Sequence, residues 1–291
     1  MMSMKGHSWP CIGIMLYSSH YYYGYIMLMI RRVYKIVLLF GLNLLFLFVG
    51  LLIRAVPFAG RSKKTHWAVR GMMFWARASC FVMGIRIQTS GFQRRPTGVF
   101  VVSNHSSYTD IPVLGSMIPT VFLSKQEVSS WFLFGRLARL GGTVFVKRES
   151  KTSTLTAVRE AGERLVEGTN IVIFPEGTTD DGRQLKEFKS SFFAIPLETA
   201  ALVLPVSIYY SHVDGVSTAL SPDNEMAWHD NRDLFGHFWN LLSKKRIDVK
   251  LHFSQVVGLR DGSPIKDRKQ FALITRQSVQ EGLDMLKTRH Q

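Results

Sequence analysis

Residues 36–53 (IVLLFGLNLLFLFVGLLI) form an apolar run of 18 residues without a charged side chain, and no other feature limits the possible folds as strongly. As a helix the run is about 27 Å long, just enough to cross the hydrocarbon core of a bilayer. It is too long for the apolar part of a signal peptide, and no cleavage site is evident. We therefore predict a retained membrane anchor. Two alternatives are a buried core helix and a helix lying in one leaflet, which Gly41, Asn43 and Gly50 favour.

Positive charge is concentrated around this run. The chain has a net charge of +15, yet residues 1–109 hold 13 Lys/Arg and no Asp or Glu, while the rest is close to neutral. Basic side chains near an anionic lipid surface contribute about 1 kcal/mol each. The pattern predicts an anionic membrane as partner and excludes a nucleic acid. Cys11 and Cys80 have no metal-ligand spacing and form no disulfide framework.

The segment after the run is also basic and apolar. Residues 66–86 mix tryptophan, phenylalanine and methionine with arginine, which predicts an amphipathic or re-entrant helix at the membrane interface. The larger positive charge on this side of the run places the remaining chain on the cytoplasmic side of the inner membrane. We divide the chain into an uninformative extension (1–30), basic apolar membrane-anchoring helices (31–90) and an α/β domain (91–291).

From residue 97 onward, strand-like and helix-like segments alternate. The expected strands are residues 99–103, 121–124, 143–147, 171–174, 202–209 and 247–257. This alternation predicts an α/β fold in which helices flank a mixed, mostly parallel sheet, preceded by an N-terminal membrane helix or helical hairpin.

Two segments of the α/β region predict helical or core structure. Residues 153–168 form the clearest helix, which Gly168 ends. Its apolar face is expected to hold Leu155, Val158, Gly162, Leu165 and Val166. The apolar run 234–242 is assigned to core packing, with membrane contact or closure of a pocket as alternatives.

His105 and Asp110 are the first candidates for chemistry, because they lie five residues apart directly after the expected strand 99–103. A tight turn would bring the carboxylate to one imidazole nitrogen, fix the tautomer and leave the other nitrogen as a base. The pair alone is equally compatible with a loop histidine and an aspartate that caps the following helix.

Three more segments place unusual residues where strands end, which is where α/β folds form their sites. They are residues 142–148 (GTVFVKR), 174–178 (FPEGT) and 204–206 (LPV). In FPEGT a glycine lets backbone N–H groups approach a ligand and the threonine hydroxyl can donate a hydrogen bond. An ordinary proline–glycine turn is the alternative for that segment.

Together these segments resemble the four sequence blocks of the PlsC-like glycerophospholipid and lysophospholipid acyltransferases. Residues 104–110 match the NHxxxxD block, and Gly142, Phe145, Val146 and Arg148 match the second block. FPEGT matches the third block and Pro205 the fourth. The resemblance covers about residues 90–260.

The resemblance implies a role for each matching residue. His105 would act as general base on a lysolipid hydroxyl, and Asp110 would orient it. The hydroxyl would attack an acyl thioester, and backbone amides near the first or third block would stabilise the oxyanion. Arg148 would contact a phosphate or another anionic headgroup. The residues that would bind substrate are Asn104, Arg148, Glu176, Gly177, Thr178 and Lys189.

One departure concerns the headgroup. The third block often continues with Arg, but here Thr179, Asp180 and Asp181 follow. Lys186, Lys189 and Arg183 lie downstream and compensate in charge. A zwitterionic headgroup, such as that of lyso-ornithine lipid, tolerates the two aspartates better than a phosphate does.

The expected function is therefore membrane-bound O-acyl transfer from acyl-CoA or acyl carrier protein to 1-acyl-glycerol-3-phosphate, giving phosphatidic acid. Another lysolipid such as lyso-ornithine lipid is the alternative acceptor. A lipid thioester hydrolase and a non-catalytic lipid-binding protein are alternatives of other classes. No cofactor is expected, and no metal site, because His105 and Asp110 lack a third ligand at recognisable spacing.

Overall fold

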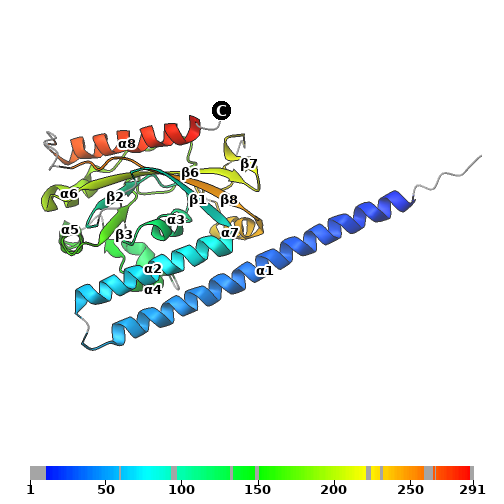
Figure 1. Cartoon of the computed structure of the whole chain (residues 1–291), viewed down its shortest axis with the longest axis horizontal. Coiled ribbons are helices and arrows are strands. Elements are labelled where there is room, and N and C mark those ends of the chain that lie inside the picture. The colour runs from blue at the N-terminus through cyan, green and yellow to red at the C-terminus, as the bar shows by residue number, and fades with distance from the viewer. Residues whose placement is uncertain are drawn as a thin grey trace, which may run out of the picture.

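The computed structural model describes residues 11–58, 60–92, 97–131, 134–147, 151–220, 224–229, 232–258, 265 and 267–288. A helical hairpin comes first, formed by α1 (Cys11–Ala55) and α2 (Arg61–Met83). An α/β body follows, and α2 lies between it and much of α1 (Figure 1). The sequence predicted such a hairpin ahead of an α/β domain.

The body is built on one eight-stranded sheet with the order β1-β8-β6-β2-β5-β3-β4, and β7 pairs with β6. Its strands are β1 (Ile85–Gly91), β2 (Phe100–Ser103), β3 (Thr120–Lys125), β4 (Val144–Val146), β5 (Asn170–Ile173), β6 (Val203–Val213), β7 (Val216–Ser217) and β8 (Ile247–Phe253). Five strand pairs are parallel, and β6 pairs antiparallel with β7 and β8. The mixed, mostly parallel sheet is confirmed.

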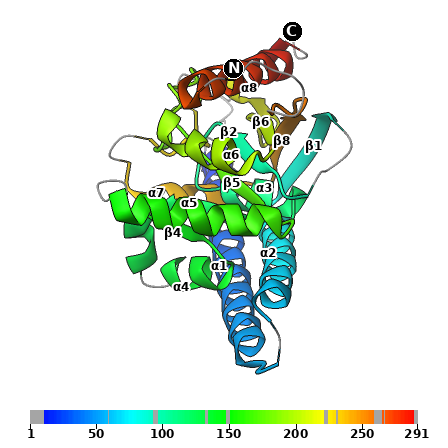
Figure 2. The same ribbon diagram turned by 90° about the vertical axis from the view of Figure 1, so that its left-hand side faces the viewer.

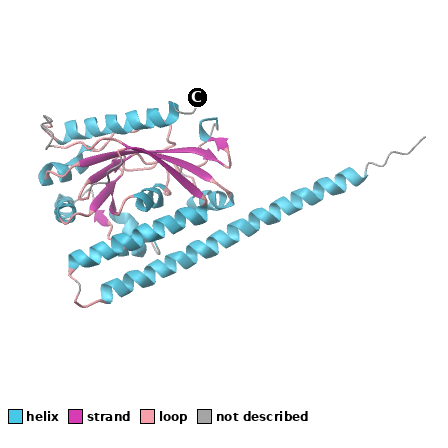
Figure 3. Ribbon diagram, viewed as in Figure 1, coloured by secondary structure: helices cyan, strands magenta, loops and turns pink. Residues whose placement is uncertain are grey.

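Helices cover both faces of the sheet (Figure 3). They are α3 (Asp110–Met117), α4 (Phe134–Leu140), α5 (Lys151–Val166), α6 (Ala194–Thr199), α7 (Leu234–Ser243) and α8 (Arg268–Thr288), with short 3-10 turns at Gln126–Ser130, Ser190–Phe193 and Thr218–Leu220. One apolar core joins the sheet to α2, α3 and α7, and a second joins it to α5 and α8. Figure 2 shows α8 on the side of the sheet opposite the α1–α2 hairpin.

Strand β1 was not predicted, because its residues were assigned partly to the helix expected over 66–86. That helix ends at Met83, and Gly84 follows in the left-handed conformation with φ 79°. A Cβ at this glycine would lie 2.3 Å from the carbonyl oxygen of Lys245. Glycine therefore stops the helix and lets the chain enter the sheet at Ile85.

The expected apolar face of α5 was partly wrong. Val158, Gly162 and Leu165 face the core as predicted. Leu155 and Val166 are instead 65% and 82% exposed. At about 100° per residue, both lie at the margin of the buried stripe, whose other members are Ala157 and Ala161.

Helix α7 also differs from its assignment to the core. Leu241 and Leu242 are fully buried, but Phe235 and Trp239 are exposed. Asp233 caps its start by accepting hydrogen bonds from the backbone N–H groups of Phe235 and Gly236. The core contacts of α7 therefore come from Phe238, Leu241 and Leu242.

One described helix, Tyr22–Ala55 within α1, is long and apolar enough to cross a membrane. Most of its side chains are uncovered by the rest of the protein, and those of Phe40, Phe48 and Leu51 are more than half exposed. The alternative of a buried core helix therefore does not hold for residues 36–53.

Lys35 fixes α1 to the rest of the protein. It lies just before the apolar run, yet its side chain is only 2% exposed. Its Nζ donates to the carbonyl oxygens of Met83 (2.9 Å), the last residue of α2, and of Lys244 (2.7 Å), the C-cap residue of α7. The ammonium thus meets the negative ends of two helices. Lys35 was expected to attract anionic lipid, but its ammonium is bound by carbonyl groups of the protein instead.

Two arginines on the same stretch of α1 support this attachment. Arg31 Nη1 donates to the carbonyl oxygen of Ser243, at 2.7 Å. The guanidinium of Arg32 lies over the ring of Trp239, 5.0 Å from its centroid. We call Arg31, Arg32 and Lys35 the clasp, since together they hold α1 against α7 and α2.

Candidate active site

The candidate site lies where β2 ends and α3 begins. Ser103 is the last residue of β2, and α3 starts at Asp110. Since β2 is a central strand with parallel neighbours on both sides, its C-terminal end opens at the edge of the sheet where α/β proteins form sites. The loop between them carries His105.

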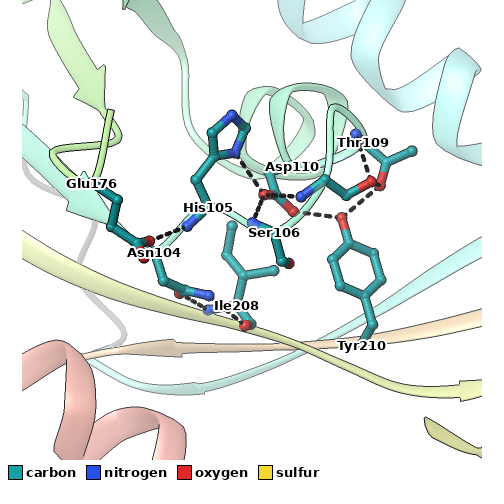
Figure 4. Close-up of polar contacts among 9 residues, drawn as sticks. Asn104, His105, Ser106, Thr109, Asp110, Glu176, Ile208 and Tyr210 are labelled. Carbon is teal, nitrogen blue, oxygen red and sulfur yellow. Dashed lines mark hydrogen bonds and ion pairs between the residues drawn. The ribbon is translucent and has the colours of Figure 1, made fainter. Parts of the chain in front are cut away.

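His105 and Asp110 are in direct contact. The His105 Nδ1 atom lies 2.8 Å from Asp110 Oδ2, and the two side chains are 17% and 0% exposed. Figure 4 shows the other ring nitrogen, Nε2, pointing away from Asp110. Among the residues that the structure describes, Nε2 has no hydrogen-bond partner. This geometry is that of a base and its orienting carboxylate.

The carboxylate of Asp110 is fully enclosed by donors. Its Oδ2 accepts from the backbone N–H groups of Ser106 (2.9 Å) and Ser107 (3.0 Å) as well as from His105. Its Oδ1 accepts from the hydroxyl of Tyr210 on β6, at 2.6 Å. Asp110 therefore orders the loop and also orients His105. The alternative that Asp110 caps the following helix is wrong, because the backbone amides that it binds lie in the loop before α3.

The imidazole of His105 is also held by stacking. The ring of Phe174 lies parallel to it, at 4.0 Å between centroids and an interplanar angle of 11°. Phe174 follows β5 and stacks in turn on Phe122 of β3. The aromatic residue that begins the FPEGT segment thus supports the histidine of the first block.

Asn104 was expected to bind substrate, and the structure places its amide inside the protein. Its Nδ2 donates to the carbonyl oxygen of Ile208 (3.0 Å), and its Oδ1 accepts from the Ile208 N–H (2.8 Å). Both amide atoms therefore join the loop to β6. Pro205 of the same strand pairs with Val102 of β2, which brings the fourth block beside the first.

Glu176 also turns inward. Its Oε1 accepts from the backbone N–H of His105 (2.7 Å) and its Oε2 from that of Lys186 (3.1 Å). Burial raises the pKa of Glu176 to about 7, although these two N–H donors favour its ionised form. In this arrangement Glu176 connects the loop of His105 to the segment after β5. A direct contact of Glu176 with the acceptor stays a prediction.

The other residues of the third block lie in the same loop. Gly177 has φ 77° and donates its N–H to the Phe174 carbonyl, and Thr178 next to it is exposed. Lys189 is exposed and its N–H donates to the carbonyl oxygen of Pro175. Arg148 lies outside the described residues.

The acidic residues that depart from the family pattern lie beside the catalytic candidate. The backbone N–H of Asp180 donates to the carbonyl oxygen of His105, at 3.1 Å. Asp180 Oδ2 lies 3.3 Å from Lys186 Nζ, and Asp181 Oδ2 lies 3.7 Å from Arg183 Nε. The loop next to His105 therefore presents charges of both signs.

Sequence reasoning placed the oxyanion donors among the backbone amides of the first or third block. In the structure, the amides of His105, Ser106 and Ser107 donate to carboxylates, and that of Gly177 closes a turn. Sequence reasoning also missed Tyr210, which lies outside the four blocks. Within the described residues, no group of three or more His, Cys, Asp and Glu side chains could hold a metal ion.

Comparisons with known proteins match this chain to acyltransferases. The acyltransferase family profile matches residues 85–209. The chain is 33% identical over 228 residues to a lyso-ornithine lipid O-acyltransferase of Rhizobium meliloti, with 76% of each chain covered. It is 36% identical to the enzyme of the same name from Pseudomonas aeruginosa, with 77% of this chain and 79% of the relative covered.

Two further matches are to proteins named for a different acceptor. A 1-acyl-sn-glycerol-3-phosphate acyltransferase of Neisseria gonorrhoeae is 32% identical, with 60% of this chain and 64% of the relative covered. The crystal structure of PlsC, the 1-acyl-sn-glycerophosphate acyltransferase of Thermotoga maritima, superposes with a TM-score of 0.65 at 21% identity. It covers 91% of this chain and 99% of that chain, and it shows the shared fold. From the profile match, the relatives and the contact between His105 and Asp110, we conclude that the chain belongs to the PlsC-like acyltransferase family.

Proposed function

We propose that this acyltransferase moves a fatty acyl group from a thioester donor to the hydroxyl of a lysolipid, with His105 as the general base. The contact of His105 Nδ1 with the buried Asp110 carboxylate carries the proposal. It fixes the proton on Nδ1 and leaves the lone pair on Nε2, which points away from Asp110. The donor is acyl-CoA or acyl carrier protein, and no cofactor takes part.

The reaction follows from this arrangement. Nε2 of His105 takes the proton of the acceptor hydroxyl while its oxygen attacks the thioester carbonyl. The tetrahedral intermediate then expels the thiolate, which takes the proton back from the imidazolium and leaves as a thiol. The Asp110 carboxylate stabilises the imidazolium between these two steps. No covalent acyl-enzyme forms.

We propose a zwitterionic lysolipid of the lyso-ornithine type as the acceptor. The relatives from Rhizobium meliloti and Pseudomonas aeruginosa, which are named for lyso-ornithine lipid, cover 76% and 77% of this chain, and the Neisseria gonorrhoeae relative, which is named for 1-acyl-glycerol-3-phosphate, covers 60%. In addition, Asp180 and Lys186 form a pair of opposite charges beside His105, which complements an ammonium and a carboxylate on one headgroup. A phosphate would meet the aspartate as well as the lysine.

The second candidate acceptor is 1-acyl-glycerol-3-phosphate, which relatives named for it support. Purified protein in lipid nanodiscs, assayed with a panel of lysolipids and with both donors, separates the two. Transfer to lyso-ornithine lipid at a higher kcat/KM supports the proposal, and a preference for the phosphate acceptor overturns the headgroup assignment. Thioester hydrolysis without transfer would identify a hydrolase, and lipid binding without turnover a non-catalytic protein.

The headgroup assignment predicts the effect of Asp180→Asn. Removing this negative charge frees Lys186, so we expect the KM for lyso-ornithine lipid to rise about two- to fivefold, the range of a partly exposed ion pair, and that for the phosphate acceptor to fall. Glu187→Gln, an exposed change in the same segment, is the matched control. Equal changes of KM for both acceptors would contradict the assignment.

We further propose that α1 anchors the protein in the cytoplasmic membrane, with the α/β body on the cytoplasmic side, where acyl donors of both kinds are made. Its length, its composition and its uncovered side chains support this.

A further inference from the structure

A buried tyrosine from a distant strand completes the surroundings of Asp110. Tyr210 lies in β6, is only 2% exposed, and donates its hydroxyl to Asp110 Oδ1 at 2.6 Å. The two residues are 100 positions apart in the chain. A hydrogen bond to an ionised carboxylate is among the stronger ones in proteins.

The two oxygens of Asp110 are held differently. Oδ2 receives three donors, all from the loop that carries His105. For Oδ1, Tyr210 is the donor that the described part of the chain provides. The phenol therefore fixes the rotation of the carboxylate about its Cβ–Cγ bond, and with it the direction of the Oδ2 lone pair that faces His105 Nδ1.

The phenol is itself fixed and kept protonated. Thr109 Oγ1 lies 2.7 Å from the Tyr210 hydroxyl oxygen and 2.9 Å from Ser107 Oγ. Burial, followed by the neighbouring negative charge of Asp110, raises the pKa of Tyr210 well above its usual value. Tyr210 is thus a permanent donor at neutral pH.

We propose that Tyr210 is a positioning residue for acyl transfer, which acts through Asp110 to hold the imidazole of His105 in its reactive tautomer and orientation. This inference rests on the proposed role of His105 as the base. It assigns a function to a residue that lies outside the four sequence blocks and does not touch substrate.

The direct test is Tyr210→Phe, which keeps the ring and removes the donor. We expect kcat to fall roughly ten- to hundredfold, the size of a lost hydrogen bond to a charged group, with the acceptor KM unchanged. Tyr209→Phe is the matched control, because Tyr209 neighbours it on β6 but packs against the opposite core, and its kcat should stay at the wild-type value. An unchanged kcat in Tyr210→Phe overturns the proposal.

A double-mutant cycle separates positioning from a general structural role. In an Asp110→Asn background, Tyr210→Phe should have no further effect on kcat, because Tyr210 acts only through the carboxylate. Independent, additive losses would show that the phenol acts in another way. If Tyr210→Phe does not fold, Thr109→Val is the substitute variant, because it removes the hydroxyl that contacts the phenol. In Thr109→Val we expect kcat to fall about threefold. An unchanged kcat in that variant overturns the proposal.

A readout without activity distinguishes failure of this inference from failure of the proposed function. The ¹⁵N signals of the His105 ring report its tautomer. We expect a single form with the proton on Nδ1 in the wild type and a mixture of forms in Tyr210→Phe. Identical ring signals in both proteins overturn the role of Tyr210, whatever lysolipid the wild type accepts.

Discussion

At the scale of single residues, the candidate site is organised around one buried carboxylate. Asp110 has no exposed surface, and hydrogen-bond donors surround both of its oxygens. All four donors are fixed by the backbone or by packed side chains before any substrate binds. The negative charge that stabilises a protonated His105 is therefore in place before the reaction. The protein does not need to rearrange around Asp110 when His105 takes up the proton.

Replacement of His105 by alanine removes the base. We expect turnover to fall at least about 100-fold while the melting temperature stays close to that of the wild type, because the side chain is partly exposed. Steady-state acyl transfer and thermal unfolding measure the two quantities. His66→Ala, an exposed change on α2, is the control and should retain activity. Near-normal turnover of His105→Ala would remove His105 from the mechanism.

Glu176 makes stability depend on pH. Its pKa rises from 4.5 to about 7 on folding, so the folded state holds this proton more tightly than the unfolded state does. The stabilisation from its protonated form is complete below pH 4.5 and is lost as the pH rises to about 7. Glu176→Gln cannot titrate, so its melting temperature should decline less over this interval. If the melting temperatures of the wild type and of Glu176→Gln declined equally with pH over this interval, the raised pKa of Glu176 would be contradicted.

The sequence revealed those site residues that lie close together in the chain. His105 and Asp110 could be paired because a five-residue turn joins them. Tyr210 could not be found, since its contact spans 100 residues and follows no local pattern. Glu176 was found, but sequence reasoning could not tell that its carboxylate accepts hydrogen bonds from the amides of His105 and Lys186.

At the scale of elements, local sequence patterns predicted six strands of the sheet and missed the edge strand β1. The six expected strands all form, although β8 ends at Phe253 and not at residue 257. Most of them are short apolar runs buried in the body, while β8 alternates buried and partly exposed residues. Strand β1 pairs only with β8, at the edge of the sheet and 162 positions away at Ser90 and His252. Its burial alternates weakly, so neither periodicity nor composition distinguished it from the end of the preceding helix.

The clasp gives a prediction for the elements that it joins. Lys35→Met keeps the length of the side chain and removes the donor for the carbonyls of Met83 and Lys244, at the C-terminal ends of α2 and α7. We expect the free energy of unfolding to fall by about 1–3 kcal/mol, as for buried acceptors left without a partner. Thermal unfolding in detergent measures this effect. Lys63→Met on α2, where the lysine is exposed, should be neutral, and equal effects of both variants would contradict the clasp.

At the scale of the whole molecule, apolar contact rather than charge should hold the protein on a bilayer. The apolar helix is long and largely uncovered, whereas clasp cations that could attract lipid bind carbonyl groups and an aromatic ring. We expect the protein to float with liposomes and to stay bound in about 1 M salt, where the Debye length is about 3 Å. Release by salt would show that charge provides the attachment.

The clasp also has a consequence for the order of events during synthesis. Helix α1 leaves the ribosome well before α7, and one of the two carbonyls that accept from Lys35 belongs to a residue made 209 positions later. Until α7 has been translated and has folded, the ammonium must remain in water or at the lipid surface. This early segment is therefore fully attached only after α7 has formed. Its angle to the body is set when the body closes on it, and not when it enters the membrane.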